Sequence, residues 1–176
     1  DAYAGSETFY RMRDKLEEIF GFKYLLPAHQ GRACENILTE FFMKPGQCVI
    51  MNYHFTTAKA HITRLGGRVY ELVKDEGLQT KSDLPFKGDI DLGKLRDCIE
   101  KEGVENVAYM RLESGTNLIG GQPMSYANMK AATDIAKEYG VKNCFVHCFM
   151  DGRDTDPKSG KGFIADLQEH MDGAGV

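Results

Sequence analysis

Apolar residues recur at helical spacing in several stretches of the chain and form short continuous runs in others. After Ser6, a residue typical of helix starts, apolar positions three or four apart continue to Phe20, and Gly21 follows as a stop signal. Short apolar runs without this spacing predict strands. The pattern predicts helices that begin near residues 7, 33, 57, 92, 125 and 163, and strands over 22–26, 48–51, 68–73, 106–112 and 143–150.

Strands therefore alternate with helices along most of the chain. Such alternation requires crossover connections and gives a mostly parallel sheet with helices on both faces, so the predicted fold class is α/β. In sheets of this kind ligands bind beyond the carboxyl ends of the strands. Three loops in such positions, around Gln30, Phe55 and Asn117, are the candidates for a functional site.

The composition narrows the class of protein. The chain has 176 residues, of which 42% are hydrophobic and 27% charged, and this predicts about one globular domain. A net charge of -4, a pI near 5.8 and the lack of long runs of one sign argue against nucleic-acid or anionic-membrane partners. No apolar stretch approaches the roughly 20 residues of a spanning helix, and the five cysteines show no zinc spacing. We expect a cytoplasmic protein with reduced, buried thiols and no metal site.

The segment 29–32, His-Gln-Gly-Arg, directly precedes a predicted helix. Free N–H groups at a helix start attract anions, Gly31 lets a ligand approach the backbone, and Arg32 adds a positive charge. A phosphate group suits this arrangement. An ordinary turn with a surface arginine is the alternative.

Two further loops combine side chains that are able to hold a ligand. The segment 55–57, Phe-Thr-Thr, follows a predicted strand and presents a ring and two hydroxyls, although an aromatic residue there also fits a core position. Asn117 stands before a glycine-rich turn and either hydrogen-bonds a ligand or caps the turn. His54, His61 and the separated carboxylates lack metal-ligand spacing and are interpreted as solvated or satisfied groups.

Five ordered segments of the chain carry a further signal when they are taken together. The segments are Asp1-Ala2-Tyr3-Ala4-Gly5-Ser6, Pro27-Ala28-His29-Gln30-Gly31-Arg32, Phe55-Thr56-Thr57, Phe86-Lys87-Gly88-Asp89-Ile90-Asp91-Leu92 and Asn117-Leu118-Ile119-Gly120-Gly121-Gln122-Pro123. Together they resemble the β-eliminating lyases, the family of tryptophanase and tyrosine phenol-lyase. The resemblance covers residues 1 to about 140 and implies a pyridoxal-phosphate enzyme of the aspartate-aminotransferase-like fold, fold type I.

The resemblance also implies roles for seven residues. Tyr3 would lie at the active site near the phosphate, where it is associated with proton delivery to the leaving group. The other six would bind the cofactor: Gln30, Gly31 and Arg32 at its phosphate, Phe55 stacked on its pyridine ring, Thr56 beside it, and Asn117 at its phenolic oxygen.

The implied reaction is β-elimination from an aromatic amino acid, which is a small-molecule substrate. Indole or phenol would leave, with pyruvate and ammonia as the other products, and the cofactor would act as the electron sink. Tryptophanase-like chemistry is favoured, with tyrosine phenol-lyase as the alternative. The family also implies a homotetramer and a bound potassium ion.

The resemblance to the lyases ends near residue 140. In the matching register the family's cofactor-binding Asp falls on Val146, and the segment with the Schiff-base Lys is missing, so we expect no elimination by this chain alone. Residues 145–160 instead resemble cofactor-independent phosphoglycerate mutase, in which Arg153 and Asp154 would bind substrate. Manganese would belong to that second resemblance, although its ligands are absent.

The sequence therefore predicts two parts: a partial lyase domain over 1–140 and a mutase-like segment over 141–176, with a junction at 138–143. The chain also begins without Met, in what resembles the middle of a functional loop, which predicts a fragment. A phosphoglycerate mutase fragment and a non-catalytic chimeric remnant are the alternatives to a lyase-derived domain.

Overall fold

The computed structural model describes residues 5–146 and divides the chain into two units, one of 1–29 with 149–176 and one of 30–148. In the first unit, α1 spans Glu7–Phe20 between its caps Ser6 and Gly21, as the sequence predicts. The predicted strand over 22–26 is wrong, because these residues form no regular structure and pair with no strand among those described. A strand needs a partner for its backbone N–H and C=O groups.

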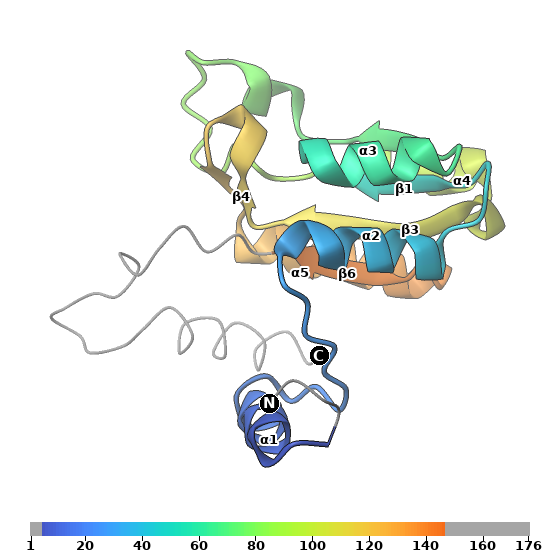
Figure 1. Cartoon of the computed structure of the whole chain (residues 1–176). Helices are drawn as coiled ribbons and strands as arrows, with labels where there is room; N and C mark the ends of the chain where they lie inside the picture. Colours follow the sequence, from blue (N-terminus) through green and yellow to red (C-terminus); the bar gives the residue numbers. More distant parts are fainter. Residues whose placement is uncertain (1–4, 147–176) are drawn as a thin grey trace, which may run out of the picture. The chain divides into compact units, whose positions relative to one another are not determined.

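The second unit is a parallel sheet of four strands in the order β2-β1-β3-β6, with a small antiparallel hairpin β4-β5 at one end (Figure 1). The strands are β1 (Cys48–Met51), β2 (Arg68–Glu71), β3 (Val107–Glu113), β4 (Gly115–Thr116), β5 (Gln122–Pro123) and β6 (Asn143–Val146). The helices are α2 (Gly31–Phe42), α3 (Thr56–Arg64), α4 (Leu92–Glu102) and α5 (Tyr126–Tyr139), with short 3-10 turns η1 (Asp75–Leu78), η2 (Val104–Asn106) and η3 (Asn117–Ile119).

Alternation along the central strands builds two cores. Ile50 faces a cluster that contains Leu95 of α4 and Ile135 of α5, whereas Val49 faces a cluster that contains Ile62 of α3. Helices α4 and α5 thus cover one face of the sheet, and α2 and α3 cover the other. All four residues of β1 are fully buried. The predicted α/β fold with a mostly parallel sheet is confirmed.

The parallel arrangement places the carboxyl ends of all four strands at one edge. Helices α2 and α3 begin at this edge, and the chain passes from β3 into the hairpin there (Figure 1). Among the described residues, no helix is both long and apolar enough to cross a membrane.

Gly88 is required where the loop before α4 passes the hairpin. A Cβ at this position would lie 2.6 Å from the carbonyl oxygen of Gln122 and 2.6 Å from Oγ1 of Thr116. We therefore expect Gly88→Ala to lower the free energy of unfolding by about 1–3 kcal/mol, the usual cost of overpacking. Urea denaturation followed by circular dichroism measures this change. Gly115→Ala is the control, because its Cβ would meet nothing within 4 Å, and equal losses in both variants would contradict the prediction.

Candidate functional site

Helices α2 and α3 differ from the other α-helices in how they begin. Side-chain oxygens of Ser6, Asp91 and Ser125 accept hydrogen bonds from backbone N–H groups at the starts of α1, α4 and α5. The residues at the same position before α2 and α3 are Gln30 and Phe55, and neither provides a side-chain cap. Both helix starts at the candidate edge therefore keep N–H groups that are able to bind an anion.

The start of α2 has the character of a phosphate site. In the described part of the chain, the N–H groups of Gly31 and Arg32 have no acceptor, and the exposed Arg32 side chain forms no ion pair. A Cβ at Gly31 would meet nothing within 4 Å. Packing within the described residues therefore does not require glycine at this position. A glycine here lets a ligand approach the backbone closely. The donor set fits the phosphate of pyridoxal phosphate.

Phe55 and Thr56 lie at the start of α3, directly beyond β1. The Phe55 ring is half-buried and packs on the edge of the core cluster that contains Val49 and Met51, while Thr56 is exposed. The aromatic residue thus combines a core contact with a remaining exposed surface. Stacking on a flat ligand requires such a surface.

Asn117 uses its backbone to shape the turn after β3. Its N–H donates to Oε1 of Glu113 at 3.1 Å, and its carbonyl oxygen accepts from Gly120 and Gly121 at 3.0 and 3.2 Å. Its side-chain amide makes no hydrogen bond within the described residues. The backbone of Asn117, rather than its side-chain amide, therefore caps this turn.

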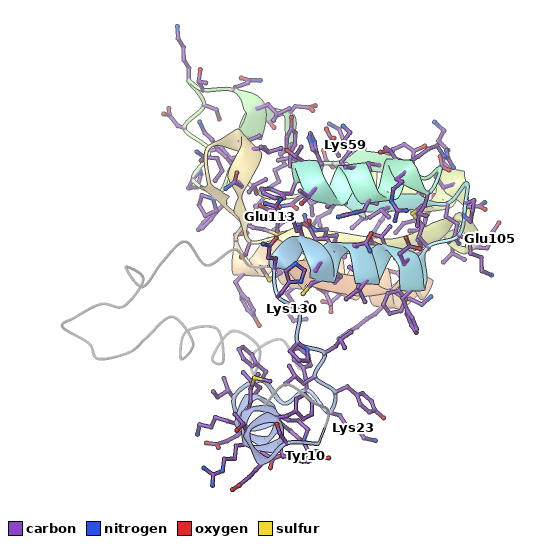
Figure 2. The ribbon with its side chains drawn as sticks, in the orientation of Figure 1. Tyr10, Lys23, Lys59, Glu105, Glu113 and Lys130 are labelled. Atoms are coloured by element: carbon purple, nitrogen blue, oxygen red, sulfur yellow. The ribbon has the colours of Figure 1, made fainter. Side chains whose placement is uncertain are left out.

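A buried ionic network links these three segments and was not predicted from the sequence. Glu35 of α2 accepts a hydrogen bond from the Thr57 hydroxyl and one from Nη2 of Arg111 at 3.1 Å. Arg111 also binds Oε2 of Glu113 at 3.0 Å through Nη1. The side chains of Arg111 and Glu113 are each 1% exposed, and that of Glu35 is 12% exposed. Figure 2 shows Glu113 at the edge where α2 and α3 begin.

The signal for this network in the sequence is the pair of charged residues inside the apolar strand β3. Isolated charges are almost never buried, so Arg111 and Glu113 in a central strand indicate a paired partner. The carboxylates were expected to be either solvated or satisfied. Glu113 is satisfied, because it accepts hydrogen bonds from Arg111 and from the N–H of Asn117. His54 is different: its Nδ1 lies 2.6 Å from Oε1 of Glu71, but this contact lacks hydrogen-bond geometry, and Nδ1 is buried without a hydrogen-bond partner within the described residues.

The cysteine thiols follow the expected pattern in part. Cys48 and Cys98 are buried, and burial raises the pKa of their thiols to about 11 and about 12. Burial also raises the pKa of Cys144, which Arg111 lowers to a smaller extent. Cys34 is exposed, contrary to the expectation of burial. These raised pKa values keep three of the thiols protonated and unreactive at neutral pH.

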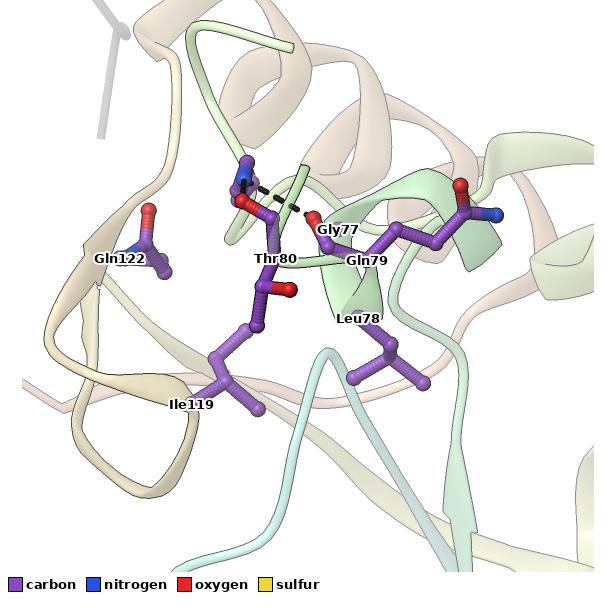
Figure 3. Close-up of a pocket in the computed structure, with 7 residues that line it drawn as sticks. Gly77, Leu78, Gln79, Thr80, Ile119 and Gln122 are labelled. Carbon is purple, nitrogen blue, oxygen red and sulfur yellow. Dashed lines mark hydrogen bonds between the residues drawn. The ribbon is translucent and has the colours of Figure 1, made fainter. Parts of the chain in front are cut away.

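A pocket of about 380 Å³ lies between η1 and the β4-β5 hairpin (Figure 3). Within it, Nζ of Lys87 donates to the carbonyl oxygens of Gln79 and Thr80 at 3.0 and 3.4 Å. None of the predicted cofactor-binding residues lines this pocket. It is lined by Gly77, Leu78, Gln79, Thr80, Lys87, Ile119 and Gln122.

The structure thus gathers the segments of Gln30, Gly31 and Arg32, of Phe55 and Thr56, and of Asn117 at one edge of the sheet. Tyr3, Arg153 and Asp154 lie outside the described residues.

Solved structures define the class of the fold. Cystalysin from Treponema denticola, which contains a pyridoxal 5'-phosphate cofactor, matches with a TM-score of 0.59 at 14% identity over 97% of this chain and 42% of its own. A PLP-bound C-S lyase from Staphylococcus hominis matches with a TM-score of 0.57 at 19% identity over 81% of this chain and 36% of its own. The chain has the fold of pyridoxal-phosphate-dependent enzymes of fold type I.

Sequence comparison then gives the family. The Beta-eliminating lyase family matches residues 1–152, and the chain belongs to it. Tyrosine phenol-lyase from Fusobacterium nucleatum is 47% identical over 142 residues, which cover 81% of this chain and 31% of that protein. Tyrosine phenol-lyase from Pasteurella multocida is 37% identical over 98% of this chain and 40% of that protein. The chain therefore spans about a third of the length of these relatives.

The family match also bears on the predicted junction at 138–143. It runs through these residues to 152, and the Pasteurella multocida alignment extends over nearly the whole chain. Residues 143–146 form β6, which pairs with β3 in the same sheet as the earlier strands. The comparisons give no support for a phosphoglycerate mutase-like segment.

Proposed function

We propose that this chain forms the cofactor-binding part of a pyridoxal-phosphate-dependent lyase that performs β-elimination on an aromatic amino acid. The observation that carries the proposal is the uncapped start of α2, where Gly31 and Arg32 keep free donors. Pyridoxal phosphate, when bound, supplies the electron sink for the elimination. Membership of the β-eliminating lyase family supports the same chemistry.

The residues at the edge divide the work of holding the cofactor. The N–H groups of Gly31 and Arg32 and the Arg32 guanidinium would bind the phosphate, with Gln30 beside them. The ring of Phe55 would hold the plane of the pyridine from one side, next to Thr56. The amide of Asn117 would donate to the phenolic oxygen, and so orient the ring within its plane. The phosphate and the ring would thus be fixed by different elements.

The finer identity of the substrate is also a proposal. The sequence alone favours tryptophan, whereas the relatives at 37% and 47% identity are named tyrosine phenol-lyases, and this favours tyrosine. We place tyrosine first, with phenol, pyruvate and ammonia as products. Tyr3 would deliver the proton to the leaving group. Potassium and a tetrameric assembly stay predictions from the family resemblance, and a cytoplasmic location stays a prediction from the composition.

The mutase-like segment over 141–176 stays a prediction of the sequence alone, as does the domain boundary after 140. Its substrate residues would be Arg153 and Asp154, and manganese would accompany them. The lyase proposal does not depend on this segment.

Titration of the purified chain with pyridoxal phosphate, followed by absorbance, tests the proposal. We expect saturable binding that Arg32→Ala weakens about 10- to 100-fold, because a charge-assisted hydrogen bond contributes roughly 1.5–3 kcal/mol. Phe55→Ala should weaken it by about 2- to 10-fold through loss of stacking. Gly31→Ala should weaken binding while the chain keeps its stability, since its Cβ has free space.

Arg11→Ala is the control for loss of a positive charge, because Arg11 is an exposed residue of α1 paired with Glu7 at 2.5 Å. Borohydride reduction and mass mapping should reveal no single preferred lysine. The proposal fails if binding does not saturate, or if Arg11→Ala and Arg32→Ala have the same effect.

A further inference from the structure

Glu35 is the residue of the network that joins α2 to both α3 and the central strand β3. It follows the Gly31-Arg32 turn by one turn of α2. Its Oε2 accepts from the hydroxyl of Thr57, the second residue of α3, and its Oε1 accepts from Nη2 of Arg111 in β3 at 3.1 Å. Its side chain is 12% exposed. A single carboxylate thus joins the starts of two helices to the central strand.

The connection continues from β3 to the third segment. Arg111 binds Glu113 at 3.0 Å, and the other carboxylate oxygen of Glu113 accepts the N–H of Asn117 at 3.1 Å. The path Thr57–Glu35–Arg111–Glu113–Asn117 therefore passes through every segment that carries a predicted cofactor-binding residue. Each link of this path is a hydrogen bond.

Burying these charged side chains costs desolvation free energy, so the network is not an efficient way to stabilise the fold. Two carboxylates and one guanidinium leave a net charge of -1 in a nearly dry site, and Nε of Arg111 is buried without an acceptor within the described residues. Apolar side chains of similar volume often hold such a contact at least as stably. What ionic groups add is a defined position, because the planar guanidinium fixes where each carboxylate lies.

We propose that Glu35 is a positioning residue that sets the start of α2, with its phosphate donors, at the correct distance from the start of α3, with Phe55, before the cofactor binds. This inference rests on the proposed function. Binding depends on such preorganisation because a ligand held by two elements loses affinity when their spacing varies.

A pair of substitutions separates position from charge. In Glu35→Gln the amide oxygen still accepts from Arg111 and the amide N–H donates to the Thr57 hydroxyl, so both contacts are kept while the charge is lost. Glu35→Ala removes both contacts. We expect Glu35→Ala to weaken pyridoxal-phosphate binding about 10- to 100-fold, the size of one charge-assisted hydrogen bond, and Glu35→Gln to stay within about threefold of the wild type.

Hydrogen–deuterium exchange of the cofactor-free chain provides a readout that does not depend on binding. Glu35→Ala should raise exchange at 30–36, 55–60 and 114–120 together, and Glu35→Gln should leave all three near the wild type. Thr57→Val removes only the contact to α3, so it should raise exchange at 30–36 and 55–60 but not at 114–120. This variant also tests the proposal if Glu35→Ala does not fold.

Glu40→Ala is the matched control. Glu40 also joins α2 to α3, through an ion pair with Arg64, but this pair is about half exposed and lies toward the other ends of the two helices. Glu40→Ala should leave both the affinity for pyridoxal phosphate and hydrogen–deuterium exchange at 30–36, 55–60 and 114–120 unchanged.

The outcomes distinguish this inference from the proposed function. If the wild-type chain does not bind pyridoxal phosphate, the proposed function fails, while the exchange pattern still tests the positioning role. The positioning role is overturned if Glu35→Gln behaves like Glu35→Ala, if Glu40→Ala has the same effect, or if exchange at 55–60 is unchanged in Glu35→Ala.

Discussion

Replacing Arg111 by methionine is expected to lower the free energy of unfolding by about 3–5 kcal/mol. The side chain of Arg111 is 1% exposed and lies between the carboxylates of Glu35 and Glu113, at 3.1 and 3.0 Å. Methionine fills much of the same volume but leaves two buried carboxylates that repel each other. Urea denaturation followed by circular dichroism measures the loss, which is a large fraction of the stability of a typical domain.

Two comparisons identify the cause of this loss. Arg96→Met breaks an exposed ion pair with Glu138 at 2.9 Å and should cost about 0–1 kcal/mol. Adding Glu35→Gln and Glu113→Gln to Arg111→Met should restore part of the stability, since no buried charge remains. A triple variant as unstable as the single one would show that packing, rather than unpaired charge, dominates.

Asn52→Leu should have an effect of similar size at the same edge of the sheet. Asn52 is fully buried directly after β1. Its amide nitrogen donates to the carbonyl oxygens of Gly88 and Glu113 at 3.0 and 2.9 Å, and its amide oxygen accepts the N–H of Glu113 at 3.0 Å. Leucine keeps the volume but leaves the Gly88 carbonyl and the Glu113 N–H without partners. At about 1–3 kcal/mol for each group, we expect a loss of about 2–6 kcal/mol.

The same denaturation measurement on Asn106→Leu provides the reference. Asn106 also donates from its side chain to a backbone carbonyl, that of Glu102 at 2.7 Å, but it is exposed, so water replaces the lost bond. Its substitution should change the stability by about 0.5 kcal/mol or less. If both variants lost the same stability, burial of the Asn52 bonds would not be the cause.

Elements with local signals were predictable from the sequence. Helix α5 begins after Ser125 and ends at Gly140, where φ is 73°, a conformation that favours glycine. Strand β1 has the predicted bounds Cys48–Met51 because four apolar residues in a row fit a strand buried on both faces. By contrast, residues 22–26 have a strand-like composition without a partner strand, and composition does not reveal the partner.

The candidate site also has parts that local sequence predicts and parts that it does not. The positions of Gln30, Gly31, Phe55 and Asn117 beside helix starts and turns follow from nearby residues, so the three loops were identified from the sequence. The contacts that offset the cost of burying Arg111 were not predictable from the sequence, because its partner Glu35 lies 76 residues away in the chain. The position of the pocket between η1 and the hairpin, where none of the predicted cofactor-binding residues lines it, likewise depends on how distant segments pack.

The α/β order of elements, the ends of most helices and the three loops at the sheet edge are thus predictable from the sequence, because caps, turns and apolar periodicity act over a few residues. Tertiary packing brings Glu35, Arg111 and Glu113 together and places the starts of α2 and α3 side by side. Such contacts join residues that are close in space and distant in sequence, so no local pattern encodes them.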